Sequence, residues 1–382
     1  MLALLLALQA GLGLGPKGRS RFDRATFDPL VEMGIERGAF PGAALVVGRH
    51  DAVLFARGYG HFTWSPSSPV PDPDSTLYDL ASVTKIVATT TVLMLLVDRG
   101  QVQLDEPVVR YIPEFHGPGT GVITVRKLLT HTSGLRATLP LFREADSAAA
   151  LRVVFAATPI VPPGTRVIYS DLNAILLGEI VRRVAGDPLD VVAAREIFRP
   201  LGLGRTLFRP GRALSPQIAP TGRWHGHAIG GVVNDQNAAR LGGVAGHAGL
   251  FASGADVARF AQFILREGVL PGGRLLRAET VRTFRTRATT PRQEAGHEAR
   301  ALGWQAVPTG ERVSSAGTIF GPRSFGHTGW TGTSLWIDPD RDLFVVLLTN
   351  RAFAPRARRS FTVLHEVRGA IADAAARASD GH

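Results

Sequence analysis

Strand-like segments near both ends of this chain most constrain what it can fold into. Residues 43–48 and 52–59 are rich in β-forming side chains and flank a short polar turn, which predicts a hairpin. Residues 335–337 and 343–349 are also strand-like, whereas residues 100–270 alternate helical patterns with Pro- and Gly-rich loops. We therefore expect one α/β unit built from both ends of the chain, with a mostly helical unit inserted between them.

Three helices can be placed from the pattern of apolar residues. An amphipathic pattern predicts a helix over residues 21–38, and a closing helix is expected over residues 360–378. Residues 86–97 are apolar nearly all round, and the run stops at Gly100. A helix without a polar face is a buried one, so this segment is expected in the core.

The first 14 residues form an apolar run that is too short for a membrane span, which needs about 20 residues. Such a run fits the apolar core of a secretory signal peptide, although no basic residue precedes Lys17. We therefore expect a signal peptide over residues 1–18, a periplasmic or secreted location and no stable membrane span. The alternative is a frayed or mis-started terminus.

Charge and cysteine content exclude several classes of protein. The chain has 43 Lys and Arg against 32 Asp and Glu, a formal net charge of +11, and no cysteine. Without cysteine there are no disulfides, zinc–thiolate sites, iron–sulfur clusters or cysteine nucleophiles. Only Lys17, Lys85 and Lys127 are lysines, and no run of five or six basic residues occurs. We therefore expect no nucleic-acid partner.

Ser82 and Lys85 form the first candidate catalytic pair. A spacing of three places both side chains on one face of a helix, at the start of the apolar helix that follows. An apolar setting near the positive end of a helix dipole disfavours an ammonium, so we expect a neutral amine that can take the serine proton. A lysine stands here although the chain uses arginine almost everywhere else, and only lysine can give up its proton.

Two further segments contain candidate catalytic or substrate-binding residues. Tyr169 and Asp171 lie between a Pro/Gly-rich loop and a helical pattern, where a phenol beside an ammonium would have a lowered pKa and could relay protons. His327, Thr328 and Gly329 belong to a strand-like stretch interrupted by glycines, as expected where a backbone approaches a ligand. Main-chain N–H groups of Ser82 and Trp330 could there form an oxyanion hole.

Other polar residues have simpler interpretations. His225, His227, His247 and Asp235 lie within a short Gly-rich stretch and could hold a metal, but a loop that lines the cleft explains them better, so no metal is predicted. His131 sits in a turn-forming loop, where a histidine more often fixes the loop backbone.

The three segments occur in the order Ser-Val-Thr-Lys, Tyr-Ser-Asp and His-Thr-Gly, at residues 82–85, 169–171 and 327–329. In this order the chain resembles the serine β-lactamase and penicillin-binding protein superfamily, in its class C-like branch of β-lactamases, esterases and D-amino-acid peptidases. Supporting stretches lie at residues 41–48, 128–135 and 329–339.

The resemblance implies a fold and a mechanism. It implies a β-lactamase/transpeptidase-like fold, α/β plus helical, in which helices flank an antiparallel sheet and a mostly helical domain is inserted. The β-lactamase-related domain spans residues 20–382, with an α/β subdomain at 20–80 and about 270–382 and a helical subdomain at about 81–269. The resemblance also implies an acyl-enzyme on Ser82 without a cofactor. The proton-handling pair would be Lys85 and Tyr169, and substrate would contact Asp171, His327, Thr328, Gly329 and Trp330.

Two departures from the family pattern bear on the substrate. Asp171 stands where the family usually has asparagine, and if ionised it would hold Lys85 more firmly charged and repel a carboxylate. His327 replaces the lysine of efficient β-lactamases, and a neutral imidazole attracts a carboxylate less at pH 7. Both argue against a specialised β-lactamase.

Three functions therefore stay open. The first is a serine hydrolase that cleaves an ester, amide or β-lactam bond of a small molecule through acyl-Ser82. The second is a DD-carboxypeptidase or penicillin-binding protein that acts on cell-wall peptides. The third is a penicillin-binding sensor module without turnover. The intact Ser82, Lys85 and Tyr169 weigh against the third. The first two share their chemistry and differ in the rate of deacylation, which no motif reports.

Overall fold

A six-stranded antiparallel sheet joins the two ends of the chain. The computed structural model describes residues 21–381 apart from 225–226, 296–297, 309–313 and 354–360, so the predicted signal peptide lies outside the described residues. The strand order is β10-β11-β12-β13-β1-β2. The strands are β1 (Gly42–Gly48), β2 (Val53–Gly60), β10 (Gln305–Ala306), β11 (Phe325–Thr328), β12 (Ser334–Asp338) and β13 (Leu343–Thr349).

The two central strands come from opposite ends of the sequence. Val46 of β1 lies opposite Val346 of β13, and both strands are buried along their whole length. This confirms the antiparallel sheet flanked by helices, and strands β1, β2, β12 and β13 lie within a residue or two of the expected segments.

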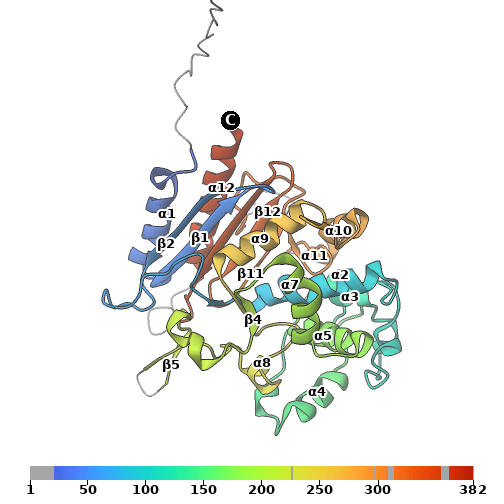
Figure 1. Cartoon of the computed structure of the whole chain (residues 1–382). Coiled ribbons are helices and arrows are strands. Elements are labelled where there is room, and N and C mark those ends of the chain that lie inside the picture. The colour runs from blue at the N-terminus through green and yellow to red at the C-terminus, as the bar shows by residue number, and fades with distance from the viewer. Residues whose placement is uncertain (1–20, 225–226, 296–297, 309–313, 354–360, 382) are drawn as a thin grey trace, which may run out of the picture.

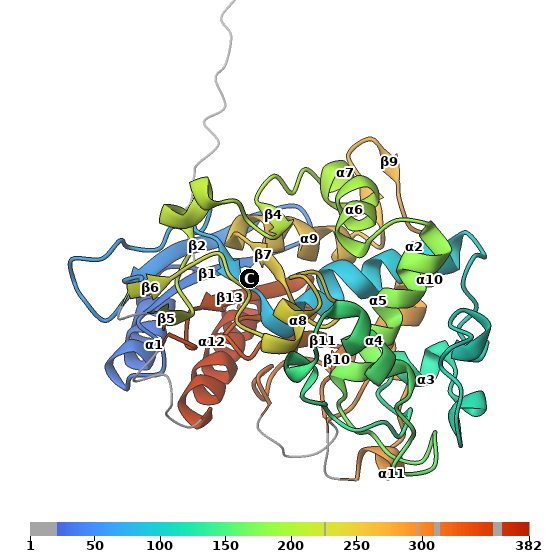
Figure 2. The same cartoon turned by 90° about the horizontal axis from the view of Figure 1, so that it is seen from below.

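Helices cover both faces of the sheet (Figure 1). Leu45 and Val47 belong to the apolar cluster that includes residues of α1 (Arg24–Glu36) and α12 (Thr362–Asp380). The alternate residues of β1 pack in the larger cluster with α9 (Gly254–Leu265). Figure 2 shows α1 beside α12 on one side of the sheet and α9 on the other. This alternation follows from the two-residue period of a strand.

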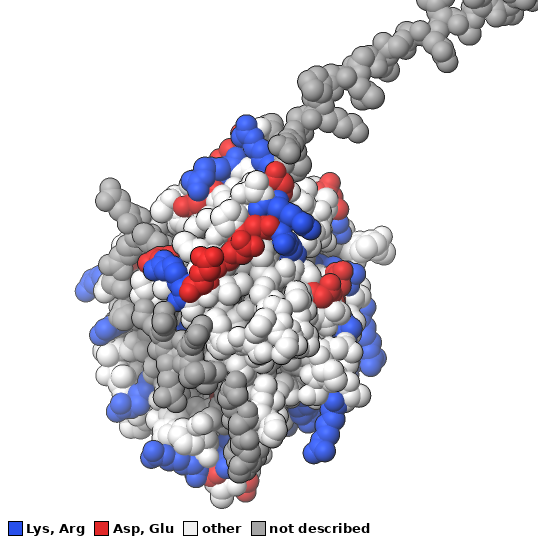
Figure 3. All heavy atoms as spheres, turned by 90° about the vertical axis from the view of Figure 1, so that its left-hand side faces the viewer, with Lys and Arg blue, Asp and Glu red and all other residues white. Residues whose placement is uncertain are grey.

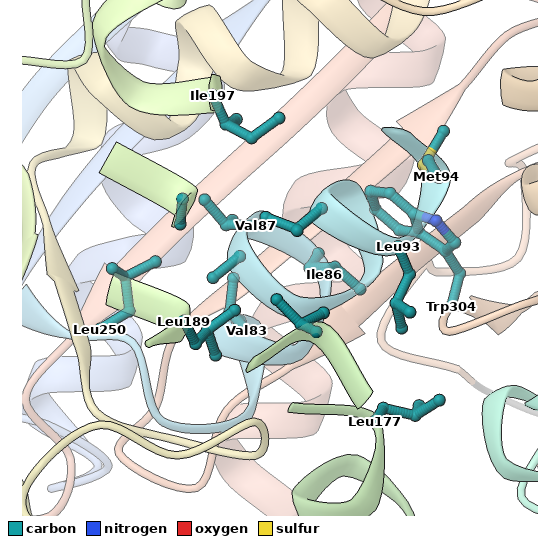
Figure 4. Packing of buried hydrophobic residues seen from close by; sticks show 14 of the residues in the cluster. Val83, Ile86, Val87, Leu93, Met94, Leu177, Leu189, Ile197, Leu250 and Trp304 are labelled. Carbon is teal, nitrogen blue, oxygen red and sulfur yellow. The ribbon is translucent and has the colours of Figure 1, made fainter. Parts of the chain in front are cut away.

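The predicted apolar helix lies in the centre of the protein. It begins with a π-helical segment (Lys85–Thr90), continues as α2 (Thr91–Asp98) and ends before Gly100, whose φ is +69°. Val83, Ile86, Val87 and Leu93 pack with side chains from several other elements (Figure 4). Within the described residues, Ala81–Asp98 is long and apolar enough to cross a membrane, but 83% of it is buried, as expected for a core helix.

Shorter elements surround this helix. A small sheet contains β3 (Tyr78–Asp79), β7 (Leu250–Ala252) and β4 (Thr206–Phe208). The other strands are β5 (Gly222–Trp224), β6 (His227–Ile229), β8 (Val269–Leu270) and β9 (Gly273–Arg274). The remaining α-helices are α3 (Val125–Leu129), α4 (Ser147–Phe155), α5 (Asp171–Ala185), α6 (Leu189–Ala193), α7 (Arg199–Leu201), α8 (Gln236–Arg240), α10 (Ala278–Arg285) and α11 (Pro291–Glu294). The division into subdomains stays a prediction; α9, which it assigned to the helical part, packs on the sheet.

The surface mixes both signs of charge. On the face in Figure 3, acidic and basic side chains lie interspersed around a broad uncharged area. Many of the arginines pair with carboxylates, for example Arg126 with Asp105 and Arg183 with Glu114. An interspersed pattern of this kind differs from the continuous basic stripe typical of nucleic-acid binding.

Candidate active site

Ser82 lies in a tight turn between β3 and the central helix. The preceding residue, Ala81, has a φ of +46°, which is unfavourable for a residue with a side chain. Buried Asp79 holds this turn, because its carboxylate accepts the N–H of Ala81 at 2.9 Å and that of Asn234 at 2.7 Å. Burial raises the pKa of Asp79 to about 6. A backbone fixed in this way presents the Ser82 side chain at a defined position.

Lys85 connects the serine to the start of α5. Its buried ammonium donates to Ser82 Oγ at 2.9 Å, to Asp171 Oδ1 at 2.8 Å and to the backbone oxygen of His247 at 3.2 Å. The spacing of three therefore brings Ser82 and Lys85 together as predicted. Three donors and three acceptors leave this ammonium fully satisfied.

The predicted neutral amine is wrong for the resting protein. Burial disfavours the charged form of Lys85, but the Asp171 carboxylate and the Tyr169 phenol outweigh it and raise the pKa of the amine above its usual value. Burial also opposes ionisation of Asp171, yet Lys85 and His247 hold the pKa of that carboxyl below its usual range. The resting state is therefore an ammonium–carboxylate pair, as expected for an ionised Asp171.

Tyr169 lies in a cage of nitrogen-bearing side chains. Its ring centroid is 4.9 Å from Lys85 Nζ and 4.8 Å from the Arg300 guanidinium, and the rings of His131 and His327 lie 4.7 and 5.9 Å away. Burial raises the pKa of Tyr169, and the lowering effect of Lys85 is weaker. The expectation of a lowered phenol pKa is therefore wrong, because it took no account of burial. Within the described residues, the buried hydroxyl has no hydrogen bond of good geometry.

His131 fixes the loop that carries Tyr169, as its sequence context indicated. Its Nδ1 accepts the backbone N–H of Ser170 at 3.1 Å and contacts the side-chain nitrogen of Asn173 at 3.2 Å. Burial, followed by the charges of Arg300 and Lys85, lowers the pKa of this imidazole well below 6.5. A neutral ring with an accepting Nδ1 therefore packs beside the phenol.

The opposite wall is the end of β11 and the turn that follows. Gly329 fits because a Cβ there would lie 2.6 Å from the backbone oxygen of Leu80. Thr331 and Thr333 donate their hydroxyls to the backbone oxygens of Asp79 and Leu80 at 2.7 and 2.8 Å. These bonds tie the wall to the turn that carries the serine.

Two main-chain donors remain available on these tied segments. Among the hydrogen bonds of the described residues, the N–H groups of Ser82 and Trp330 have no acceptor. Both residues line the same cavity. They are therefore suited to bind an oxyanion formed on a carbonyl that Ser82 attacks.

His327 is neutral and cannot act as a cation at pH 7. Its Nδ1 donates to the backbone oxygen of Thr328 at 2.8 Å, and the side chain is buried. Burial, followed by Arg300 and Lys85, lowers the pKa of the imidazole well below 6.5. An acid-induced gain of carboxylate binding at His327 is therefore not expected in the physiological range.

Two cavities meet at the serine. One, of about 630 Å³, is lined by Thr328, Gly329, Arg300 and Arg368 among others, and the second, of about 580 Å³, by Asp171 and Asp235 among others. Ser82, Tyr169 and Trp330 line both cavities. A substrate bound across Ser82 would therefore extend into a cationic chamber on one side and an acidic chamber on the other.

Arg300 is a site residue that sequence reasoning missed. Its side chain is 2% exposed, and Nη2 pairs with Glu298, while buried Nε and Nη1 have no partner among the described residues. A buried guanidinium with unused donors is suited to bind an anionic group of a ligand. Nothing in the sequence distinguishes Arg300 from the other arginines.

The candidate metal ligands are only partly brought together. Ligand atoms of Asp171, Asp235 and His247 lie within 4.8 Å of one another, and His247 Nε2 is 3.0 Å from Asp235 Oδ1. The Lys85 ammonium already contacts Asp171, so a cation occupies this cluster without a metal. His227 is exposed on β6, and His225 lies outside the described residues.

Comparisons with known proteins show the family of the chain. A protein named "Putative D-alanyl-D-alanine carboxypeptidase" from Escherichia coli (strain K12) is 31% identical over 353 residues, which cover 83% of this chain and 80% of that protein. A penicillin-binding protein homologue from Caulobacter crescentus has a TM-score of 0.74 at 21% identity, covering 96% of this chain and 99% of that chain. EstCE1, a hydrolase with promiscuous acyltransferase activity, has a TM-score of 0.73 at 22% identity, covering 91% and 98%. The family model described as Beta-lactamase matches residues 24–368, so the chain belongs to the β-lactamase family and is a serine hydrolase.

Proposed function

We propose that this enzyme is a carboxypeptidase-type hydrolase that cleaves short peptides bearing a free carboxylate through an acyl-enzyme on Ser82. The observation that carries the proposal is the 2.9 Å contact between Ser82 Oγ and Lys85 Nζ, where two chambers meet and one holds the unsatisfied Arg300. The name of the Escherichia coli relative supports a peptide substrate. Export, which residues 1–14 favour, would place the enzyme beside cell-wall peptides.

In the proposed reaction, Ser82 Oγ attacks the carbonyl carbon, and its proton passes to Lys85 in the amine form. The N–H groups of Ser82 and Trp330 bind the oxyanion. When the C–N bond breaks, the Tyr169 hydroxyl gives its proton to the leaving nitrogen and regains one from the Lys85 ammonium. Water then hydrolyses the ester, which frees the acid and restores Ser82.

Arg300 is assigned the role of anchoring the carboxylate, in place of His327. A neutral imidazole offers no charge, whereas the buried Arg300 guanidinium is a cation, and its Nε and Nη1 have no partner among the described residues. We expect Arg300→Gln to raise KM for a peptide acid and to leave KM for the corresponding peptide amide unchanged.

The test uses an N-acylated peptide ending in D-Ala-D-Ala, with its C-terminal amide as the matched control. The proposal expects release of D-Ala from the acid, a preference for acid over amide, and no release by Ser82→Ala. Intact-protein mass spectrometry after incubation with a β-lactam should show one adduct in the wild type and none in Ser82→Ala. Equal turnover of acid and amide, or release by Ser82→Ala, would overturn the proposal.

A second candidate function is hydrolysis of apolar esters. Three large apolar side chains line the two chambers while staying partly exposed to solvent: Phe142, Trp330 and Phe361. An apolar rim of this kind favours an uncharged acyl or alkyl group. If p-nitrophenyl esters of increasing chain length give a higher kcat/KM than any peptide acid, this function replaces the first.

A further inference from the structure

The closing helix of the chain places a second buried arginine behind the oxyanion site. Arg368, on α12, is 6% exposed, and its Nη2 donates to the backbone oxygens of Thr333 at 2.7 Å and Gly329 at 3.3 Å. Burial, followed by the charge of Arg351, lowers the pKa of Arg368 to about 9, which leaves the guanidinium protonated at neutral pH. The mechanism above does not use this cation.

The Gly329 oxygen belongs to the peptide group that carries the Trp330 N–H. A cation that hydrogen-bonds the oxygen of an amide draws electron density away from its nitrogen, so the N–H becomes a stronger donor. Trp330 N–H is one of the two free donors beside Ser82. The charge of Arg368 therefore reaches the oxyanion position through a single peptide group.

The same arginine holds the turn in place. Thr333 O, which accepts from Arg368, also accepts the Gly329 N–H at 2.7 Å and so closes the turn. The hydroxyls of Thr331 and Thr333 fix this turn to the backbone before Ser82. Arg368 therefore supports the position of the Trp330 N–H as well as its donor strength.

The charge balance of the resting protein favours this role. Among the described residues, no carboxylate pairs with Arg368, and its buried Nε has no partner. A buried cation without a counter-ion is costly in the ground state. The charge would be balanced when negative charge forms on the substrate oxygen, which is the condition for transition-state stabilisation.

We propose that Arg368 is a positioning residue that strengthens the oxyanion hole by polarising the Gly329–Trp330 peptide group and fixing its turn. The proposal rests on the acyl-enzyme chemistry proposed above. It differs from the role of Arg300, which acts on an anionic substrate group, because an oxyanion forms on neutral and anionic substrates alike.

Arg368→Gln removes the charge and keeps a hydrogen-bond donor, and Arg368→Lys keeps the charge. Arg285→Gln is the control, because it removes a largely buried guanidinium that pairs with Glu267 and lines neither chamber. We expect Arg368→Gln to lower kcat by about 10- to 100-fold on a neutral ester and on a peptide acid, with little change in KM, since losing one oxyanion-hole donor costs about 10²- to 10³-fold. Arg368→Lys should retain more activity than Arg368→Gln, and the control should leave the turnover of both substrates unchanged.

An infrared measurement separates polarisation from mere structural support. The carbonyl stretch of the acyl-Ser82 ester should lie at higher frequency in Arg368→Gln than in wild type and be unchanged in Arg285→Gln. An unchanged stretch in Arg368→Gln, or a loss of kcat confined to peptide acids, would overturn the inference. If Arg368→Gln does not fold, the acyl-Ser82 ester of Arg368→Lys is measured instead. The lysine ammonium lies at a different place from the guanidinium, so the carbonyl stretch of this ester should also lie at higher frequency than in wild type. Failure of the wild type to form any acyl-enzyme would instead refute the proposed function.

Discussion

Asp171→Asn should make this enzyme faster at neutral pH. The change removes the carboxylate that lies 2.8 Å from Lys85 Nζ and raises the pKa of that amine. At this separation the attraction is about 6 kcal/mol for an effective dielectric constant of about 20. A quarter of the Asp171 side chain is exposed, so solvent screens part of this attraction, and we expect the substitution to lower the pKa of Lys85.

The consequence is a shift in the pH profile of acylation. Only the amine form of Lys85 can take the Ser82 proton, so the wild-type rate should rise with pH until Lys85 is deprotonated. In Asp171→Asn this rise in rate should occur at lower pH, and the acylation rate at pH 7 should increase about tenfold for each unit by which the pKa of Lys85 falls. The asparagine amide can still accept a hydrogen bond from Lys85, so the position of the amine is preserved.

Burst kinetics with a neutral ester between about pH 5 and 10 measure this rise in acylation rate without a charged substrate. Asp235→Asn is the matched control, because Asp235 lines the same chamber but contacts His247 rather than Lys85. A parallel series with an anionic β-lactam should show a larger gain in acylation rate, since the Asp171→Asn substitution also removes a negative charge that repels the substrate. A profile of Asp171→Asn that superimposes on wild type, or a slower enzyme at every pH, would refute the reasoning.

Three further outcomes are expected. Lys85→Arg should lose about as much activity as Lys85→Ala, on the order of 10³-fold, because arginine keeps the charge but cannot accept a proton; substantial activity in the arginine variant would place the base elsewhere. Ala81→Gly should raise the free energy of unfolding in urea by up to about 1 kcal/mol, since glycine tolerates a φ of +46°, and should slow acylation; a less stable variant would contradict this. In the folded protein the pKa values of His131 and His327 are held below 6.5, the usual value in an unfolded chain. Below pH 6.5 the unfolded chain therefore binds protons that the folded protein does not, and the free energy of unfolding falls by about 1.4 kcal/mol per pH unit for each histidine. Urea unfolding at pH 7, 6 and 5 should show this decline, and His131→Gln should weaken its slope.

Local sequence patterns predicted most of the helices and strands that frame the site. β1 and β13 are short runs of apolar, β-forming side chains, and the central helix is a longer apolar run that stops at Gly100, so all three could be placed from their apolar residues alone. The contact between Ser82 and Lys85 could be predicted from helix geometry, because one helical turn separates them. These features depend on neighbours in the sequence.

The electrostatics of the site depend on neighbours in space. Asp171 contacts Lys85 although 86 residues separate them, and this contact, together with the Tyr169 phenol, makes Lys85 an ammonium instead of the expected amine. In the sequence, Arg300 and Arg368 cannot be distinguished from the other arginines. Tertiary packing alone buries their side chains. Burial likewise reversed the expected pKa shift of Tyr169, since a loop tyrosine carries no sequence signal for how deeply its ring is covered.

The pairing of β1 with β13 has a consequence for the order in which the protein matures. During synthesis, the segment with Ser82 and Lys85 leaves the ribosome more than 200 residues before the Gly329 turn and the α12 arginine. Until then β1 lacks its partner on one side, and the nascent chain carries a nucleophile without an oxyanion hole. Pairing across such a sequence distance is slow compared with local contacts. Hydrolytic activity should therefore appear only after the last strands are released, so ribosome-bound or C-terminally truncated chains would be inert.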